Sequence, residues 1–137
     1  MPTYDMPRDI PSPEPNPENE AYFAAAAEGH LLIKRCRSCG EFHHYPRAIC
    51  PLCFSADTEW VRAQGRGTIY TYSVLRRGAP RPFCLAYVTL AEGITMMTNI
   101  VDCDLDGLSI GLPVQVVFRR TRNGIAIPMF TPVGSDQ

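Results

Sequence analysis

Four of the six cysteines lie close together as two Cys-x-x-Cys pairs, Cys36 with Cys39 and Cys50 with Cys53. Ten residues separate the two pairs, so a short hairpin can bring them together. A Cys-x-x-Cys turn holds two thiolates on one side of a tight loop, and two such turns make a tetrahedral metal site. Gly40, after the first pair, fits the positive-φ position that this turn often needs. The spacing predicts one structural zinc ion per chain, with iron in rubredoxin geometry as the alternative.

Two other kinds of cysteine chemistry fit the sequence less well. A thioredoxin-like redox motif has one Cys-x-x-Cys at a helix start in a βαβ unit, whereas both pairs here lie among predicted strands. Structural disulfides belong to oxidising compartments. The first residues, MPTYDMPRDIPSPEP, have no basic segment followed by an apolar one, and no apolar run approaches ~20 residues. The sequence therefore predicts a cytoplasmic protein with reduced thiols.

The remaining residues that could carry chemistry do not form a known catalytic motif. Four protein ligands close a zinc site, so the predicted metal is structural rather than catalytic. His43 and His44 lie between the cysteine pairs and are interpreted as loop histidines near the metal. Cys84 and Cys103 fall in predicted strands, where a free cysteine is usually a small buried hydrophobe. The sequence has no Gly-x-Ser-x-Gly, His-Glu-x-x-His or glycine-rich phosphate loop, so no catalytic residue is predicted.

Arginine dominates the basic residues, since Lys34 is the only lysine among 13. Residues 34–81 hold nine bases and three acids, although the whole chain has a net charge of -1. Arginine presents a planar fork of donors that matches phosphate oxygens. The basic stretch is therefore a candidate contact for an anionic partner.

An arm and a helix are predicted ahead of the cysteines. Six of the 13 prolines lie before residue 18, which predicts an extended arm over residues 1–16. A helix is expected over residues 17–30, because Asn16 suits its N-cap and four consecutive alanines favour its propagation. Tyr22 and Phe23 share one face of this helix. One short helix cannot bury that face alone, so we expect it to pack on the rest of the chain or on another protein.

Strands and turns follow the helix. Residues 31–63 are predicted to form a zinc ribbon, and residues 64–137 a β-barrel. Five strand patterns occur across residues 66–131, and the dipeptide Asn123-Gly124 predicts a hairpin turn. The predicted fold is mainly β, with an N-terminal helix, a rubredoxin-like zinc ribbon and a five-stranded OB-fold barrel.

A known family is similar to this sequence over about residues 17–131. The resemblance lies in the stretches EAYFAAAAEGHLLIKRCRSCGEFHHYPRAICPLC, GRGTIYTYSV and MMTNIVDCDLDGLSIGLPVQVVF. They resemble the zinc-ribbon/OB-fold proteins that were long filed as a domain of unknown function and later linked to acyl-CoA metabolism. The family has the same order of helix, rubredoxin-like ribbon and OB barrel. Its four zinc ligands correspond to Cys36, Cys39, Cys50 and Cys53.

The resemblance implies a non-catalytic accessory subunit that binds or channels acyl-CoA and supports a partner enzyme. Partners in the family are thiolase-superfamily enzymes, namely thiolases, acyltransferases, lipid-transfer-protein-like aldolases and 3-hydroxy-3-methylglutaryl-CoA synthase. Some members are fused to or paired with hotdog-fold hydratases. In this sequence Tyr22 and Phe23 are the candidate partner interface.

CoA carries a 3′-phosphate and a pyrophosphate, which arginine side chains can bind. Arg66, Arg76, Arg77 and Arg81 are therefore the candidate CoA-binding residues. The alternative function is a nucleic-acid-binding module, because OB barrels and zinc ribbons both occur there. Strand alternation places Tyr70 and Tyr72 on one face, where they could stack on bases, but a pI near 6.3 disfavours a phosphate backbone as the partner.

Overall fold

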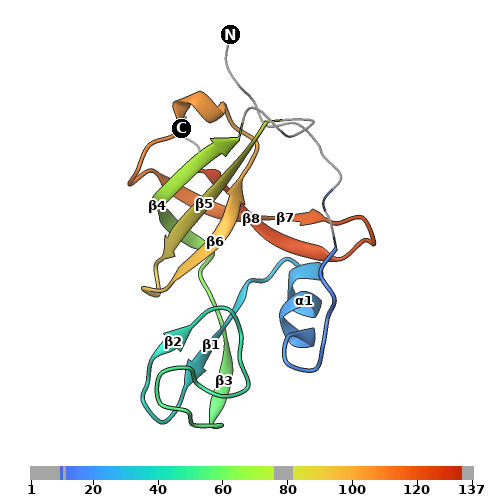
Figure 1. The fold of residues 1–137 in the computed structure, drawn as a ribbon, viewed down its shortest axis with the longest axis vertical. Coiled ribbons are helices and arrows are strands. Elements are labelled where there is room, and N and C mark those ends of the chain that lie inside the picture. Colours follow the sequence, from blue (N-terminus) through green and yellow to red (C-terminus); the bar gives the residue numbers. More distant parts are fainter. Residues whose placement is uncertain (1–9, 11, 76–81, 134–137) are drawn as a thin grey trace.

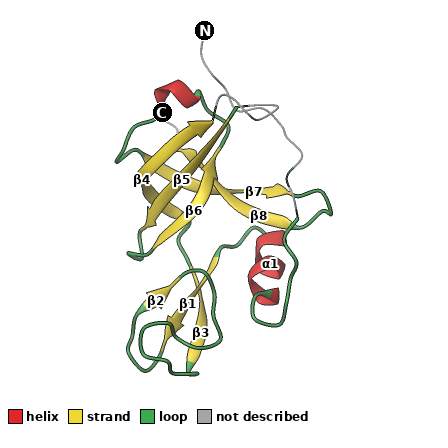
Figure 2. Cartoon of the chain, viewed as in Figure 1, coloured by secondary structure: helices red, strands yellow, loops and turns green. Residues whose placement is uncertain are grey.

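A computed structural model describes residues 10, 12–75 and 82–133 of the chain. A β-barrel lies above a small three-stranded sheet in Figure 1, and helix α1 (Glu20–Ala27) lies beside both. Figure 2 shows that strands predominate over helix in the described residues. The predicted fold class is confirmed: one N-terminal helix, a cysteine-rich ribbon and then a closed five-stranded barrel.

The small sheet is built on a central strand that carries the first cysteine. Its strands run antiparallel in the order β2-β1-β3. In β1 the side chains of Ile33 and Cys36 are buried, at 1% and 0% exposure. Lys34 is also buried, and its ammonium lies 4.3 Å from the centre of the Trp60 ring. The bounds are β1 Leu32–Cys36, β2 Phe42–His43 and β3 Thr58–Arg62.

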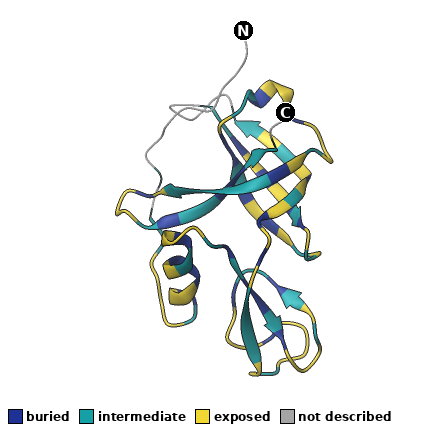
Figure 3. Cartoon of the chain, turned by 180° about the vertical axis from the view of Figure 1, so that it is seen from behind, coloured by how far each residue is buried: buried dark blue, intermediate teal, exposed yellow. Residues whose placement is uncertain are grey.

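The barrel has the strand order β4-β5-β6-β8-β7 and closes by pairing β4 with β7. All of its pairs are antiparallel except β6 with β8, which meet at Ile100 and Phe130. Burial alternates along β5 and β6, so each of these strands sends one row of side chains inward, and Figure 3 shows buried and exposed positions mixed along the barrel strands. A single 3₁₀ turn, η1 (Leu105–Gly107), lies between β6 and β7. The bounds are β4 Arg66–Leu75, β5 Phe83–Leu90, β6 Thr95–Ile100, β7 Pro113–Arg120 and β8 Ala126–Pro132.

One apolar core runs from the barrel interior to α1 and the start of the ribbon. Side chains that are at most 1% exposed fill the barrel. Tyr22 and Phe23 from α1 belong to the same cluster of buried residues, together with Ile33 from β1. The most deeply buried barrel residues are Ile69, Cys84, Ala86, Val88, Ile100, Leu105, Val114 and Phe130.

Helix α1 is shorter at both ends than the predicted span of residues 17–30. The side-chain oxygen of Asn16 accepts hydrogen bonds from the backbone N–H groups of Glu18 and Asn19, at 2.9 and 3.1 Å. These bonds make a turn that precedes the helix instead of capping it. Among the helices of the described residues, none has the length and apolar character needed to cross a bilayer.

The described part of the N-terminal arm is attached to the turn between β7 and β8. The hydroxyl of Ser12 donates to the hydroxyl of Thr121 at 2.6 Å and accepts from the backbone N–H of Asn123 at 2.8 Å. The carbonyl of Ile10 accepts from the N–H of Arg122 at 2.9 Å. Ile10 and Ser12 are thus attached to the hairpin of β7 and β8.

A β-bulge corrects the prediction that Tyr70 and Tyr72 share a face. The register of β4 against β5 shifts between Ile69 and Thr71, so Tyr70 is the extra residue and the alternation reverses there. Tyr70 is 66% exposed. Tyr72 instead packs against the core, and its hydroxyl donates to the carbonyl of Leu108 at 2.8 Å.

Barrel closure depends on a residue without a side chain at the start of β4. Gly67 pairs with Leu90 on one side and with Val114 on the other. A Cβ atom at this position would lie 2.4 Å from the carbonyl oxygen of Thr89 and 2.9 Å from a methyl carbon of Val88. The first contact is with backbone, which cannot rotate away.

We therefore expect Gly67→Ala to lower the free energy of unfolding by roughly 1–3 kcal/mol, the usual cost of overpacking. Gly107→Ala is the matched control, because a Cβ there meets nothing within 4 Å. Urea unfolding followed by circular dichroism measures both. Equal midpoints for the two variants would contradict this account of barrel closure.

Candidate metal centre and adjoining groove

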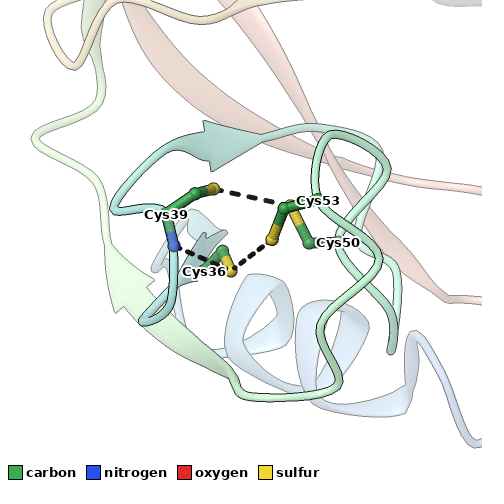
Figure 4. A group of neighbouring side chains, drawn as sticks. All are labelled: Cys36, Cys39, Cys50 and Cys53. Atoms are coloured by element: carbon green, nitrogen blue, oxygen red, sulfur yellow. Dashed lines mark hydrogen bonds between the residues drawn. The ribbon is translucent and has the colours of Figure 1, made fainter.

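The structure brings the four paired cysteines together at one end of the ribbon (Figure 4). Their sulfur atoms all lie within 4.8 Å of one another. The Sγ of Cys36 is 3.5 Å from that of Cys53, and the Sγ of Cys39 is 3.8 Å from that of Cys50. A tetrahedral zinc ion with Zn–S bonds of about 2.3 Å spaces its sulfurs by about 3.8 Å. The donor set and its spacing therefore fit zinc.

The two Cys-x-x-Cys turns have the same backbone pattern. In each, the residue after the second cysteine donates its N–H to the carbonyl of the first, at 2.8 Å for Gly40 and 2.9 Å for Phe54. Further N–H groups point at sulfur: Cys39 donates to Cys36 Sγ at 3.5 Å, and Leu52 to Cys50 Sγ at 3.4 Å. Such donors stabilise thiolate sulfur, which is the form that binds metal.

The electrostatics of the cluster also favour a bound cation. A hydrogen bond from the backbone N–H of Cys39 lowers the pKa of the Cys36 thiol to about 6. At Cys53 the N–H of Ser55 acts to lower the pKa, but the neighbouring sulfurs, with Cys36 first, outweigh it and raise the pKa to about 12. Without a metal, one thiol thus ionises readily and the next resists. A divalent cation removes that resistance by compensating the accumulated negative charge.

The two loop histidines lie outside the four-sulfur cluster. The Nε2 of His43 accepts the backbone N–H of Arg47 at 3.3 Å, and the ring is 6% exposed. His44 instead lies against α1, with its ring 5.7 Å from that of Tyr22. Burial lowers the pKa of His44 to about 4, so its imidazole is neutral at pH 7.

The loop between the cysteine pairs holds the N-terminal end of α1. The carboxylate of Glu18 accepts the backbone N–H of Ala48 at 2.8 Å, and this bond lowers the Glu18 pKa. The amide of Asn19 donates to the hydroxyl of Tyr45 at 2.8 Å, and Asn19 itself is 4% exposed. The loop between the cysteine pairs, residues 40–49, is called the metal loop below. It and α1 therefore form one packed unit.

A mainly apolar groove of about 440 Å³ lies between this unit and the barrel. The Nδ1 atom of His44 is buried, and no hydrogen-bond partner for it occurs among the described residues. Met97, at the rim, is 56% exposed. Residues from α1, from the metal loop and from β6 and β8 line the groove, among them Tyr22, Phe23, His44, Met96, Met97 and Met129.

The other predicted site residues are distributed as follows. Tyr22 and Phe23 are buried in the chain's own core, at 4% and 8% exposure, and their role at a partner interface stays a prediction. Arg66 is exposed at the first residue of β4. The predicted CoA-binding residues Arg76, Arg77 and Arg81 lie outside the described residues.

Sequence reasoning missed the groove, because its lining comes from segments far apart in the chain. Their meeting depends on the docking of α1, which no local pattern records. Cys84 is buried inside the barrel, as predicted, and burial raises the pKa of its thiol to about 11. It therefore stays protonated at pH 7.

Comparison with protein families matches most of the chain to two consecutive domain models. Residues 23–59 match the rubredoxin-like zinc ribbon domain of ChsH2. Residues 60–119 match the C-terminal OB-fold domain of ChsH2. The boundary between the two models falls within β3.

Several relatives have names that describe a subunit or a scaffold. A probable enoyl-CoA hydratase alpha subunit from Thermomonospora curvata is 34% identical over 126 residues, which are 89% of this chain and 40% of that protein. The chain thus spans less than half the length of this relative. A DUF35 domain-containing scaffold protein from Methanocaldococcus jannaschii is 37% identical over 67% of this chain and 70% of its own length. A benzoylsuccinyl-CoA thiolase subunit, BbsA, from Geobacter metallireducens is 29% identical over 52% of this chain and 50% of its own.

A solved structure described as an Ltp2-ChsH2(DUF35) aldolase matches with a TM-score of 0.77 and 34% identity. The match covers 88% of this chain and 98% of the matched chain. The match therefore extends over most of this chain and is not confined to one of its two domains.

Elemental analysis of the purified protein should find about one zinc, and no iron, per chain. Cys39→Ser should lose the metal and melt at a lower temperature, because binding energy in such a site is folding energy. Cys103→Ser, outside the cluster, should keep the metal. If Cys39→Ser melts like the unmodified protein, the metal has no structural role.

Proposed function

Because this chain belongs to the DUF35 family of zinc-ribbon and OB-fold proteins, we propose that it is an accessory subunit of a thiolase-superfamily enzyme. In this proposal the chain binds acyl-CoA while its partner performs the chemistry. The observation that carries the proposal is the match to nearly the full length of a chain in the Ltp2-ChsH2(DUF35) aldolase. The relative named as a thiolase subunit and those named as scaffold proteins support it.

We assign a structural role to the zinc ion, with Cys36, Cys39, Cys50 and Cys53 as its ligands. When bound, zinc joins the two Cys-x-x-Cys turns and so holds the loop that carries Tyr45. Four sulfur ligands complete its coordination, so the substrate has no position on the metal. The protonated thiol of Cys84 is likewise unsuited to nucleophilic attack. Both observations support catalysis by the partner.

The groove beside α1 is our candidate site for the acyl group. Its apolar lining suits a hydrocarbon chain. The phosphates of CoA would be bound by arginine, for which Arg66 and the sequence-predicted Arg76, Arg77 and Arg81 stay the candidates.

The structure removes one argument for the alternative function, nucleic-acid binding. The two tyrosines that were expected to stack on bases do not share a face, because the bulge in β4 turns Tyr72 into the core. Exposed Tyr70 remains, but one aromatic ring is a small part of a stacking surface.

The partner is tested by purifying the tagged full-length chain from its source organism. We expect a thiolase-superfamily subunit to co-purify in a defined ratio, and its turnover of acyl-CoA to depend on this chain. The isolated chain should turn over no acyl-CoA. Turnover by the isolated chain, or recovery of nucleic acid in place of an enzyme, would contradict the proposal.

The two ends of the proposed ligand are tested separately within that complex. Arg66→Ala should raise the KM for acyl-CoA by roughly tenfold, since a charge-assisted hydrogen bond contributes ~1.5–3 kcal/mol. It should leave the KM for the matching acyl-pantetheine, which lacks the nucleotide, unchanged. Met97→Trp, which narrows the groove, should raise the KM for both substrates.

Arg62→Ala is the control for Arg66→Ala, because Arg62 is also an exposed strand arginine but outside the predicted set. Equal losses for both substrates with Arg66→Ala would mean that Arg66 supports the fold or the interface. An unchanged KM with Met97→Trp would remove the groove from the proposal.

A further inference from the structure

The second Cys-x-x-Cys turn carries a phenylalanine where its backbone conformation favours glycine. Gly40 and Phe54 occupy the same position in the two turns, directly after the second cysteine. Their φ angles are +79° and +66°, and both donate an N–H to the first cysteine of their pair. The first turn therefore shows which residue this geometry accepts without strain, and the second turn departs from it.

A positive φ brings Cβ close to the following carbonyl oxygen, so a bulky residue rarely adopts it. Burial of the ring could offset this cost, but Phe54 is 79% exposed. Within this chain, burial of the Phe54 ring therefore contributes little free energy to offset the cost of the strained backbone. Strain that persists without an internal benefit points to a function outside the chain.

Two further apolar side chains close to Phe54 in sequence are also exposed. Ile49 is 53% exposed and Leu52 is 62% exposed, and together with Phe54 they form what we call the knuckle tip. The charged residues that flank it in sequence are in ion pairs within the chain, Arg47 with Glu18 at 3.5 Å and Asp57 with Arg37 at 3.4 Å. The knuckle tip is therefore apolar and suits neither CoA phosphates nor nucleic acid.

We propose that the knuckle tip is an anchor that inserts Phe54 into an apolar pocket of the thiolase-superfamily partner, an inference that rests on the proposed function. A standard protein interface buries about 800 Å² on each side, whereas a large aromatic side chain supplies about 150–250 Å². Three side chains are thus too few for stable self-association, but they suffice for the central contact of a larger interface. A membrane surface is disfavoured as the binding partner of the tip. Membrane binding usually uses free cationic side chains, and Arg47, the cation that flanks the tip in sequence, is in an ion pair with Glu18.

The metal makes this anchor rigid. Phe54 follows Cys53 directly, and its backbone is fixed by the bond to Cys50. A side chain held in this way loses little conformational freedom when the partner binds. None of the three tip residues lines the groove, so docking through the tip does not itself use groove residues.

The test uses full-length zinc-loaded protein and the enzyme subunit that co-purifies with it. Phe54→Gly and Phe54→Asn both suit a positive φ, so each should keep the zinc and melt at the same temperature or higher. Both should weaken binding to the partner at least tenfold by calorimetry. Phe54→Tyr should keep the affinity within about threefold. Ile110→Ser, which removes a 70% exposed apolar side chain from the loop before β7, is the control and should leave it unchanged.

The outcomes separate this inference from the proposed function. Absence of any complex with unmodified protein overturns both. If the partner subunit binds unmodified protein and Phe54→Gly with equal affinity, the anchor alone is overturned. An equal loss of affinity with Ile110→Ser has the same consequence. Two further results would overturn it: a dimer in sedimentation that Phe54→Gly dissociates, or Phe54-dependent binding to phosphatidylcholine–phosphatidylserine vesicles.

Discussion

The convergence of four sulfurs on one cation is the constraint on which the lower half of the molecule depends. The ribbon has few residues and a short sheet, and chains of that size seldom bury enough apolar surface to fold alone. In such small units metal ligation commonly supplies the missing free energy, and here a bound zinc ion would also fix the loop between the cysteine pairs. That loop binds Glu18 and Asn19 ahead of α1 through backbone and side-chain hydrogen bonds. The position of α1, and with it the part of the groove lined by Tyr22 and Phe23, thus depends on hydrogen bonds to the metal loop.

The barrel is stabilised in a different way. Its strands pair in a closed circle and fill the interior with aliphatic and aromatic side chains. Closure places Gly67 of β4 between β5 and β7, where a side chain would collide with the backbone of Thr89. The two parts are therefore destabilised in different ways. Chelators are expected to destabilise the ribbon, and changes of side-chain volume are expected to destabilise the barrel.

The parts that sequence could predict are those that local chemistry determines. The Cys-x-x-Cys spacing reports the metal site because both ligand pairs lie within short turns. Alternating apolar residues and the Asn123-Gly124 turn report the barrel strands. Three features were not accessible in this way. The bulge at Tyr70 depends on pairing with β5, the groove depends on docking between distant segments, and the exposure of Phe54 depends on the backbone angle of the second turn.

The attachment of the arm to the last hairpin has a consequence for how the protein is made. Ser12 and Thr121 are separated by 109 positions, so the arm has no binding site until the turn between β7 and β8 has left the ribosome. All four metal ligands, in contrast, emerge within one short stretch and can close on a cation early. Local contacts form faster than distant ones, so the ribbon is expected to assemble first and the barrel to close last. The arm then binds only after the hairpin of β7 and β8 has formed.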